Sequence, residues 1–492
     1  MAKHPVSRVM STQHPDNVRT PFFSANAILE GDEEIKECFY VFSHLNIDEQ
    51  LWDMDGKEVD NFVVKKLLSK YSDYFRKTRL GKDKLLTLRV PNPEIERNES
   101  KLLMECLSSI PRHYDLAKEF YGENDGRNAP IFEVAIPMCA SEEIVRFIHH
   151  LYKEHIGFSN HTILGSPITK WMGKYYPDAI RVIPLFETKE AMLNADKIVS
   201  SYVKAEGIKE YQRVWLARSD PALNYGSTTT VLLIKIALQR LYAAQQDAGI
   251  DLLPIIGCGT APFRGNFSPL NAKAMLDGYP SCQTFTAQSA FKYDFSPQEV
   301  QHGVEMVCET PVRKPVSIDE DVALPLAEKM EKDYTVCITL LHETINRFAA
   351  LIPSRRKRKL HIDLFGYARS MANFKLPRAI PFCASLYSLG LPPDLFGVSA
   401  LTAREVEALR AFYPTIDNDM QAGLQYLNED NLSHFSPEIR KRVDAVKELF
   451  AIETNEEHKE ITSSIMHDFA KGDMAKLHDD ILKAGNVRKF LG

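Results

Sequence analysis

The residues RVWLARSD (213–220), followed after PALNYG by STTTVLLIKIALQRLYAAQQ (227–246), decide the fold class. The first run is largely apolar up to a polar end, which predicts a strand over 212–218 with Asp220 in the loop behind it. The second run begins with Ser and Thr, which suit helix capping, and has an apolar face at three- and four-residue spacing, which predicts a helix. Strand, loop and helix form a βα unit, and repeated βα units build either an open doubly wound sheet or a closed barrel.

Further strand-like runs alternate with helix-like runs along much of the chain. Runs such as VIPLF (182–186) and LLPII (252–256) are apolar on both faces, as in strands covered on both sides. Functional side chains of a (β/α)8 barrel lie where strands end, and polar residues follow most of these runs in that way. We therefore expect an α/β fold of the (β/α)8 TIM-barrel type with additional helices, mainly C-terminal. The strands are expected at 49–53, 83–89, 131–137, 181–186, 212–218, 252–257, 283–287, 361–366 and 379–383.

The domain organisation is expected to be simple. The chain has no low-complexity tract, no fixed-period repeat and no Gly/Ser- or Pro-rich linker, so no tethered module is indicated. We expect residues 1–492 to form a single catalytic domain with a mostly helical extension over approximately 384–492. TAREVEALRAFY (402–413) is one helix of this extension, and its Thr402 and Glu405 match a capping box.

Composition excludes some functional classes. The 492 residues carry a net charge of -6, which does not favour a nucleic-acid partner, although a scaffold or nucleic-acid-binding protein that uses SRRKRK (354–359) is an alternative. The eight cysteines form no C-x-x-C pair, so we expect reduced thiols rather than a zinc or redox site. No apolar run has the length of a signal peptide or a membrane span. We expect a cytoplasmic protein without a membrane or nucleic-acid partner.

Two of the expected strands end on carboxylates, Glu187 in RVIPLFETK (181–189) and Asp220 in RVWLARSD. No histidine or cysteine stands beside either of them. Such a pair suits a hard cation, Mg²⁺ or Mn²⁺, better than zinc. The alternative is that each is a helix N-cap or a surface acid at a strand end.

Arginines form the second candidate group. They are Arg89 in KLLTLRVPN, Arg264 in GTAPFRGN, Arg369 in GYARS and Arg378 in LPRAIPF. A guanidinium can hold a phosphate or carboxylate through two parallel hydrogen bonds. Each arginine alone fits a surface ion pair, but together with the acid pair they predict an enzyme for a phosphorylated or carboxylated small molecule. His14, in STQHPDN (11–17), fits either an ordered active-site loop or a loose N-terminal tail.

Taken together, these segments resemble phosphoenolpyruvate carboxylases of the shorter archaeal type, over about residues 10–400. STQHPDN and GTAPFRGN are the most specific motifs, and LFET, LARSD and LPRAIPF occur in the family's order. The resemblance implies that Glu187 and Asp220 bind the metal and that His14 is the essential histidine. It further implies that Arg264, Arg369 and Arg378 surround the phosphate and the reacting carboxyl group, that Arg89 binds substrate, and that Gln288 and Lys292 lie near the site.

The implied reaction converts phosphoenolpyruvate and bicarbonate to oxaloacetate and phosphate, through carboxyphosphate and a metal-stabilised enolate of pyruvate. The alternative is another divalent-metal barrel lyase or phosphotransferase that acts on pyruvate or its enolate and needs no bicarbonate. The resemblance also implies a homotetramer. In one respect the chain departs from the longer enzymes, which have a second histidine and another arginine in their glycine-rich loop. Ile256 and Cys258 stand there, so a base role for that histidine does not transfer.

Overall fold

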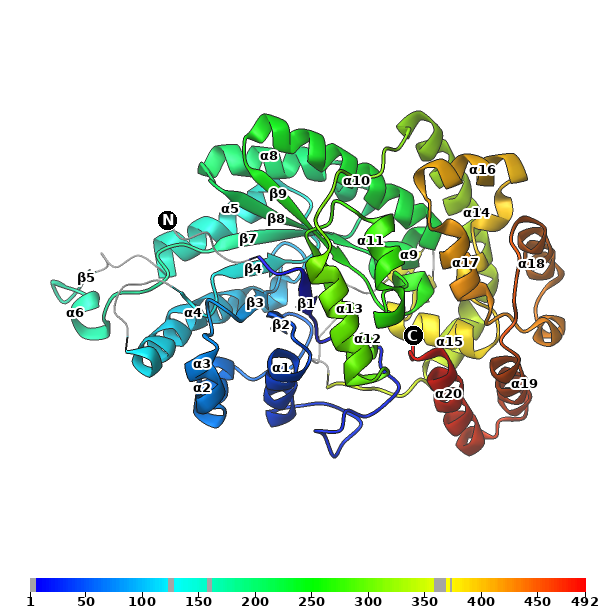
Figure 1. The fold of residues 1–492 in the computed structure, drawn as a ribbon, viewed down its shortest axis with the longest axis horizontal. Coiled ribbons are helices and arrows are strands. Elements are labelled where there is room, and N and C mark those ends of the chain that lie inside the picture. The colour runs from blue at the N-terminus through cyan, green and yellow to red at the C-terminus, as the bar shows by residue number, and fades with distance from the viewer. Residues whose placement is uncertain (1–5, 123–127, 157–161, 358–368, 372–373) are drawn as a thin grey trace.

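The computed structural model describes residues 6–122, 128–156, 162–357, 369–371 and 374–492 (Figure 1). Eight strands form a closed barrel in the order β1-β10-β9-β8-β7-β4-β3-β2, and all neighbouring pairs are parallel. The expected (β/α)8 architecture is therefore confirmed. The barrel strands are β1 (Val9–Ser11), β2 (Glu49–Asp53), β3 (Leu85–Arg89), β4 (Glu133–Ile136), β7 (Arg181–Phe186), β8 (Tyr211–Ala217), β9 (Asp251–Gly257) and β10 (Thr284–Ala287).

Helices surround the barrel and continue beyond it. Those up to the last barrel strand are α1 (Asp32–His44), α2 (Val63–Lys70), α3 (Ser72–Lys77), α4 (Ser100–Tyr121), α5 (Glu142–His150), α6 (Thr169–Met172), α7 (Lys189–Leu193), α8 (Ala195–Glu206), α9 (Ser219–Tyr225), α10 (Ser227–Ala248) and α11 (Ala272–Gly278). The later ones are α12 (Ser289–Tyr293), α13 (Pro297–Glu309), α14 (Glu320–Ala349), α15 (Ala379–Ser388), α16 (Ala403–Phe412), α17 (Ile416–Leu424), α18 (Pro437–Leu449), α19 (Glu456–Lys471) and α20 (Met474–Arg488). Two short hairpins, β5 (Thr162–Ile163) with β6 (Ser166–Pro167) and β11 (Arg369–Met371) with β12 (Phe374–Leu376), lie outside the barrel.

The C-terminal helices gather beside the barrel rather than around it (Figure 1). Residues 384–492, all of which the structure describes, contain helices and turns and no strand. They share one hydrophobic cluster with the barrel, which includes Ile255 of β9 as well as Ile481 and Leu491. Among the described residues, no helix is both long enough and apolar enough to cross a membrane.

Two of the expected strands need comment. The strand expected at 379–383 is wrong, because these residues begin helix α15. All ten residues of α15 except Pro381 are buried, so apolar residues occur on every side of the helix and the helical period is hidden. Pro381 lies in the first turn, where its missing N–H costs no hydrogen bond. The strand expected at 361–366 lies outside the described residues.

The remaining barrel strand was missed by the sequence analysis. It is β1, whose three residues pair with β10 on one side and β2 on the other and so close the barrel. Its shortness hides the alternation that identifies longer strands. STQHPDN is consequently not a loose tail: it follows a barrel strand, and its Thr12 N–H donates to Ala287 O at 2.9 Å.

Helix ends match the sequence in one case and differ in another. Thr402 and Glu405 form the expected capping box at the start of α16. The Ser and Thr residues that begin α10 do not cap it, because Gly226, with φ of 90°, occupies the N-cap position without a side-chain hydrogen bond. Ser227 Oγ instead accepts a hydrogen bond from Arg218 Nη2 at 2.8 Å.

Candidate active site

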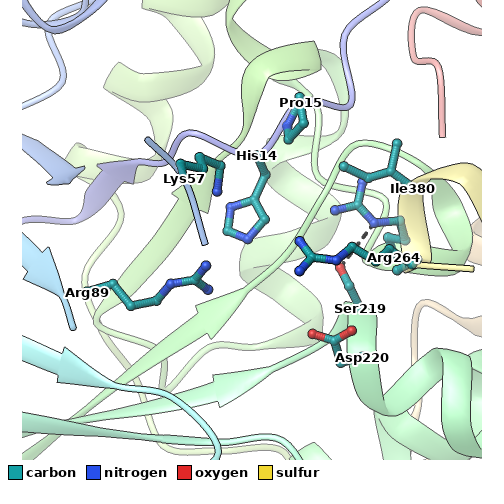
Figure 2. Close-up of a pocket in the computed structure, with 10 residues that line it drawn as sticks. His14, Pro15, Lys57, Arg89, Ser219, Asp220, Arg264 and Ile380 are labelled. Carbon is teal, nitrogen blue, oxygen red and sulfur yellow. Dashed lines mark hydrogen bonds between the residues drawn. The ribbon is translucent and has the colours of Figure 1, made fainter. Parts of the chain in front are cut away.

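A pocket lies where the carboxyl ends of the barrel strands meet (Figure 2). Its lining combines four cationic side chains, one histidine and one carboxylate. The residues are His14, Pro15, Lys57, Arg89, Ser219, Asp220, Arg264, Arg378, Ala379 and Ile380. Because all strands are parallel, segments that follow β1, β2, β3, β8 and β9 reach the same end of the barrel.

His14 follows β1 and lies in the middle of the labelled side chains (Figure 2). Its Nδ1 is 2.9 Å from Thr12 Oγ1. Burial, and then the positive charges of Lys57 and Arg89, hold the pKa of His14 well below its usual value. The imidazole is therefore neutral at physiological pH and has a lone pair for a proton.

Arg264 ends a single 3₁₀ turn, Pro262–Arg264, in the loop after β9. Its guanidinium is buried and donates to Ser219 Oγ at 3.1 Å and to Gln288 Oε1 at 2.6 Å. It also donates to Asp16 Oδ2 at 3.2 Å and to Gly492 O at 2.7 Å.

Two glycines let this loop close tightly around Arg264. A Cβ at Gly259 would lie 2.9 Å from Arg264 Nη1. Gly265 has φ of 136°, and a Cβ there would lie 2.7 Å from Cys258 Cβ. Glycine is therefore required at both positions for the guanidinium to be held as it is.

On the other side of His14, Lys57 and Arg89 point into the pocket (Figure 2). Both pair with one buried carboxylate, Asp53, the last residue of β2. Arg89 Nε and Nη2 donate to its two oxygens, each at 2.8 Å. The Asp53 N–H donates to Gln13 Oε1 at 2.9 Å, so the β1 loop and the β2 end are joined.

The two expected metal ligands follow neighbouring strands, β7 and β8. Asp220 lies in the first turn of α9 and lines the pocket. Glu187 is buried, and its Oε2 accepts a hydrogen bond from Met138 N at 2.6 Å. The described residues contain no group of three or more His, Cys, Asp or Glu side chains that could hold a metal. One or two carboxylates with water and substrate ligands are the usual Mg²⁺ site, so the donors present fit that ion.

Arg378 occupies the N-cap position of α15 and lines the pocket. The backbone of Arg369 pairs with Leu376 in the β11–β12 hairpin, two residues before Arg378. The side chain of Arg369 lies outside the described part of the structure.

The pocket lining and the contacts of Arg264 include several residues that the sequence analysis did not single out. Ser219 precedes Asp220 and accepts a hydrogen bond from Arg264. Asp16, two residues after His14, is buried and also accepts from Arg264. Lys57 follows the strand predicted at 49–53 within DMDGK, a charged strand end of the kind used to find the other residues, so the same signal could have identified it.

The two weaker expectations near the site have different outcomes. Gln288 contacts Arg264 directly. Lys292 is buried outside the pocket lining, where it donates to Ser11 Oγ, Thr12 O and Glu37 Oε1. At the position of the longer enzymes' loop histidine and arginine, Ile256 and Cys258 are both fully buried, and burial raises the pKa of Cys258 to about 12, so it remains a thiol.

A closed parallel barrel that presents arginines, a neutral histidine and the carboxylate of Asp220 in one pocket defines a (β/α)8-barrel enzyme for a small anionic substrate. Residues 6–492 match the family model described as phosphoenolpyruvate carboxylase, and the chain belongs to that family.

Similar curated proteins carry the same family name and are covered almost completely. Phosphoenolpyruvate carboxylase of Methanospirillum hungatei is 47% identical over 490 residues, which cover 99% of this chain and 100% of that protein. The enzyme of Methanothermobacter thermautotrophicus is 45% identical, and that of Pyrococcus abyssi is 43% identical, with the same coverage of both chains.

Proposed function

We propose that the protein carboxylates phosphoenolpyruvate with bicarbonate to give oxaloacetate and phosphate. The observation that carries this proposal is the pocket itself. Around one neutral histidine it combines Arg89, Arg264 and Arg378 with Asp220, in a chain that belongs to the phosphoenolpyruvate carboxylase family. Phosphoenolpyruvate presents a phosphate and a carboxylate, and arginine recognises both groups.

In this proposal, Arg264 and Arg378 bind the phosphoryl group and neutralise the charge that is redistributed when bicarbonate attacks phosphorus. The buried contacts of Arg264 hold its guanidinium in place before substrate arrives, so little reorganisation is needed. Arg369 is proposed to join them around the carboxyphosphate that forms. Arg89, fixed by Asp53, binds the substrate on the other side of His14.

Phosphoenolpyruvate carboxylases generally depend on a divalent metal, and Glu187 with Asp220 are the proposed ligands for Mg²⁺ or Mn²⁺. A cation held there would supply positive charge next to the oxygen that becomes negative when the phosphoryl group leaves. Three further lining residues, Pro15, Ala379 and Ile380, are apolar and help to keep water from the enolate, whose protonation would give pyruvate.

His14 is proposed to take the proton of bicarbonate or of the carboxyphosphate that it becomes. This role needs the tautomer in which Nδ1–H donates to Thr12 Oγ1 and Nε2 keeps its lone pair. CO₂ released from carboxyphosphate is then captured by the methylene carbon of the enolate.

The test is oxaloacetate formation from phosphoenolpyruvate and Mg²⁺, with and without bicarbonate, measured by coupling to malate dehydrogenase. We expect bicarbonate-dependent oxaloacetate that is lost in Asp220→Asn. Lys189→Gln, a change in a partly exposed ion pair with Glu331 outside the pocket lining, is the control and should keep its activity. Phosphate and pyruvate without oxaloacetate would instead favour a lyase or phosphotransferase of pyruvate.

We also propose a cytoplasmic homotetramer that acts as a single catalytic domain and binds neither nucleic acid nor membranes. All eight cysteines are free, which suits a reducing compartment. Exposed apolar side chains at Leu164, Trp171 and Met172, on and beside the β5–β6 hairpin, offer a contact surface for a second subunit. Sedimentation velocity measures the assembly, and a monomer at micromolar concentration would contradict it.

A further inference from the structure

Lys57 is a pocket residue to which the proposed function gives no role. It reaches the pocket from the turn after β2, and its side chain lies on the same side of His14 as Arg89 (Figure 2). We propose that Lys57 and Arg89 together form a binding site for a planar carboxylate-type anion, either the carboxylate of phosphoenolpyruvate or bicarbonate. This inference rests on the proposed function and adds a substrate-binding residue to it.

The site is built before any ligand binds. Asp53 is 1% exposed, and it accepts both hydrogen bonds of Arg89 while it pairs with Lys57 four residues later. Asp53 and Arg89 are also register partners in the β2–β3 pair, so their backbones are fixed side by side. Gly56 N donates to Asp53 Oδ1 at 3.2 Å, and a Cβ at Gly56 would lie 3.2 Å from Arg89 Nη2. The turn therefore closes tightly and directs the lysine toward the cavity.

Charge in this part of the pocket is positive on the side that faces His14. Asp53 and a second buried acid, Asp55, whose Oδ2 is 3.7 Å from Arg89 Nη2, compensate the two cations, and neither acid lines the pocket. The charges that act on His14 come from Lys57, Arg89, Asp53 and Arg264, and the lysine has the largest effect among them. An anion that enters beside His14 consequently meets the ammonium and the guanidinium before it meets either carboxylate.

The position of Lys57 and Arg89 relative to Arg264 also fits a substrate with two anionic ends. Arg264 lies on the opposite side of His14 from Lys57 and Arg89 (Figure 2). A phosphoryl group held at Arg264 and Arg378 would leave a carboxylate or a bicarbonate to be held at Lys57 and Arg89. Asp53 accepts from Nε and Nη2 of Arg89, so a planar anion would meet the charge of this guanidinium together with the ammonium of Lys57.

The decisive variant is Lys57→Met. It should fold, because Asp53 keeps both hydrogen bonds from Arg89 and is not left as an unpaired buried carboxylate. Lys57→Arg retains the positive charge and should recover part of the lost affinity. Lys66→Met is the matched control, since it removes the same charge from a partly exposed ion pair with Asp60 and Asp32 that does not line the pocket.

Steady-state kinetics with each substrate varied in turn, together with calorimetric binding of phosphoenolpyruvate in the presence of Mg²⁺, distinguish the sources of the anion. We expect Lys57→Met to raise one KM at least tenfold. A higher KM and Kd for phosphoenolpyruvate identify its carboxylate as the ligand, and a higher KM for bicarbonate alone identifies bicarbonate. If a folded Lys57→Met protein keeps both KM values and the Kd within about twofold of the parent, the inference is wrong. A parent protein that forms no oxaloacetate would refute the proposed function, while the calorimetric comparison would still test Lys57.

Discussion

At the scale of single residues, Arg264 shows how little of a buried guanidinium remains for a ligand. Arginine has five N–H groups. Four of those of Arg264 donate to protein acceptors, at Ser219, Asp16, Gly492 and Gln288. One Nη2–H has no acceptor among the described residues. Arg264 can therefore offer a phosphoryl group its charge and a single hydrogen bond, and the other cations of the pocket must supply the remaining contacts.

His14→Asn should uncouple the two halves of the proposed reaction. Asparagine can still hydrogen-bond to Thr12 Oγ1, but it cannot accept a proton as the neutral imidazole of His14 can. We expect oxaloacetate formation to fall by about 10²–10⁴-fold, the usual contribution of a positioned base. Phosphate and pyruvate should still be released, because the arginines remain in place. The measurement is phosphate release compared with oxaloacetate formation in the same sample, and unchanged oxaloacetate formation would remove His14 from the mechanism.

At the scale of elements, sequence patterns located the long strands. They failed for elements in which apolar and polar residues do not alternate clearly. The strands at 49–53 and 181–186 begin and end as expected, because apolar runs with polar ends mark them clearly. The pattern misidentified α15 because nearly all of its residues are buried, and it missed β1 because three residues carry too little alternation. His14 was consequently identified by its motif and not by its place behind a strand.

The site residues that the sequence could predict are likewise those that follow clearly marked strands. Positions of Arg89, Asp220 and Arg264 follow from strand ends, because side chains at the carboxyl ends of parallel strands must converge. The contact of Arg264 with Gly492 could not be predicted, because it joins positions 228 residues apart through packing of the C-terminal helices. Lys57 was also missed, although it follows the strand predicted at 49–53 and the strand-end signal was therefore present.

The barrel interior contains a buried ionic group that should dominate local stability. Arg213 of β8 donates to Glu49 of β2 at 2.7 Å and to Glu133 of β4 at 2.8 Å, and all three side chains are buried. Arg213→Met would leave two buried carboxylates without their cation, which typically costs about 3–5 kcal/mol. Chemical denaturation measures this loss. The control is Lys273→Met in an exposed pair with Asp277, for which we expect a change of about 1 kcal/mol or less, and equal effects of the two variants would contradict the prediction.

Asp394 should make stability depend on pH. Burial raises its pKa to about 7, although Tyr387 OH donates to its Oδ2 at 2.5 Å. Folded protein therefore keeps the proton between the ordinary pKa of about 4 and pH 7, while unfolded protein releases it, so stability falls as pH rises through this window. Asp394→Asn should remove this dependence. The free energy of unfolding of the variant, taken relative to that of the parent, should therefore be higher at pH 7 than at pH 4 by at most about 4 kcal/mol. Denaturation at both pH values measures the difference, and parallel pH profiles of variant and parent would contradict the assignment.

At the scale of the whole molecule, the C-terminal helices and the barrel meet at the pocket. Tyr387 of α15 accepts a hydrogen bond from Phe263 N, next to Arg264, at 3.2 Å. Beyond α20, Leu491 N donates to Asp16 O at 2.7 Å, so the segment after this helix is joined to the β1 loop. The added helices therefore hold two loops that carry site residues, and damage to their packing should reduce activity as well as stability.

Gly492→Ala tests this connection between the two halves of the molecule. A Cβ at position 492 would lie 2.2 Å from Ile380 O and 2.7 Å from Ala384 N, so the segment must move away from α15. Arg264 would then lose its acceptor at Gly492 O. Because positioning errors of about 1 Å cost around 10²-fold in rate, we expect kcat/KM to fall by about 10–100-fold with a small change in Tm. Lys483→Ala, an exposed change on α20, is the control, and a Gly492→Ala protein with the kcat/KM of the parent would show that Arg264 is held without this segment.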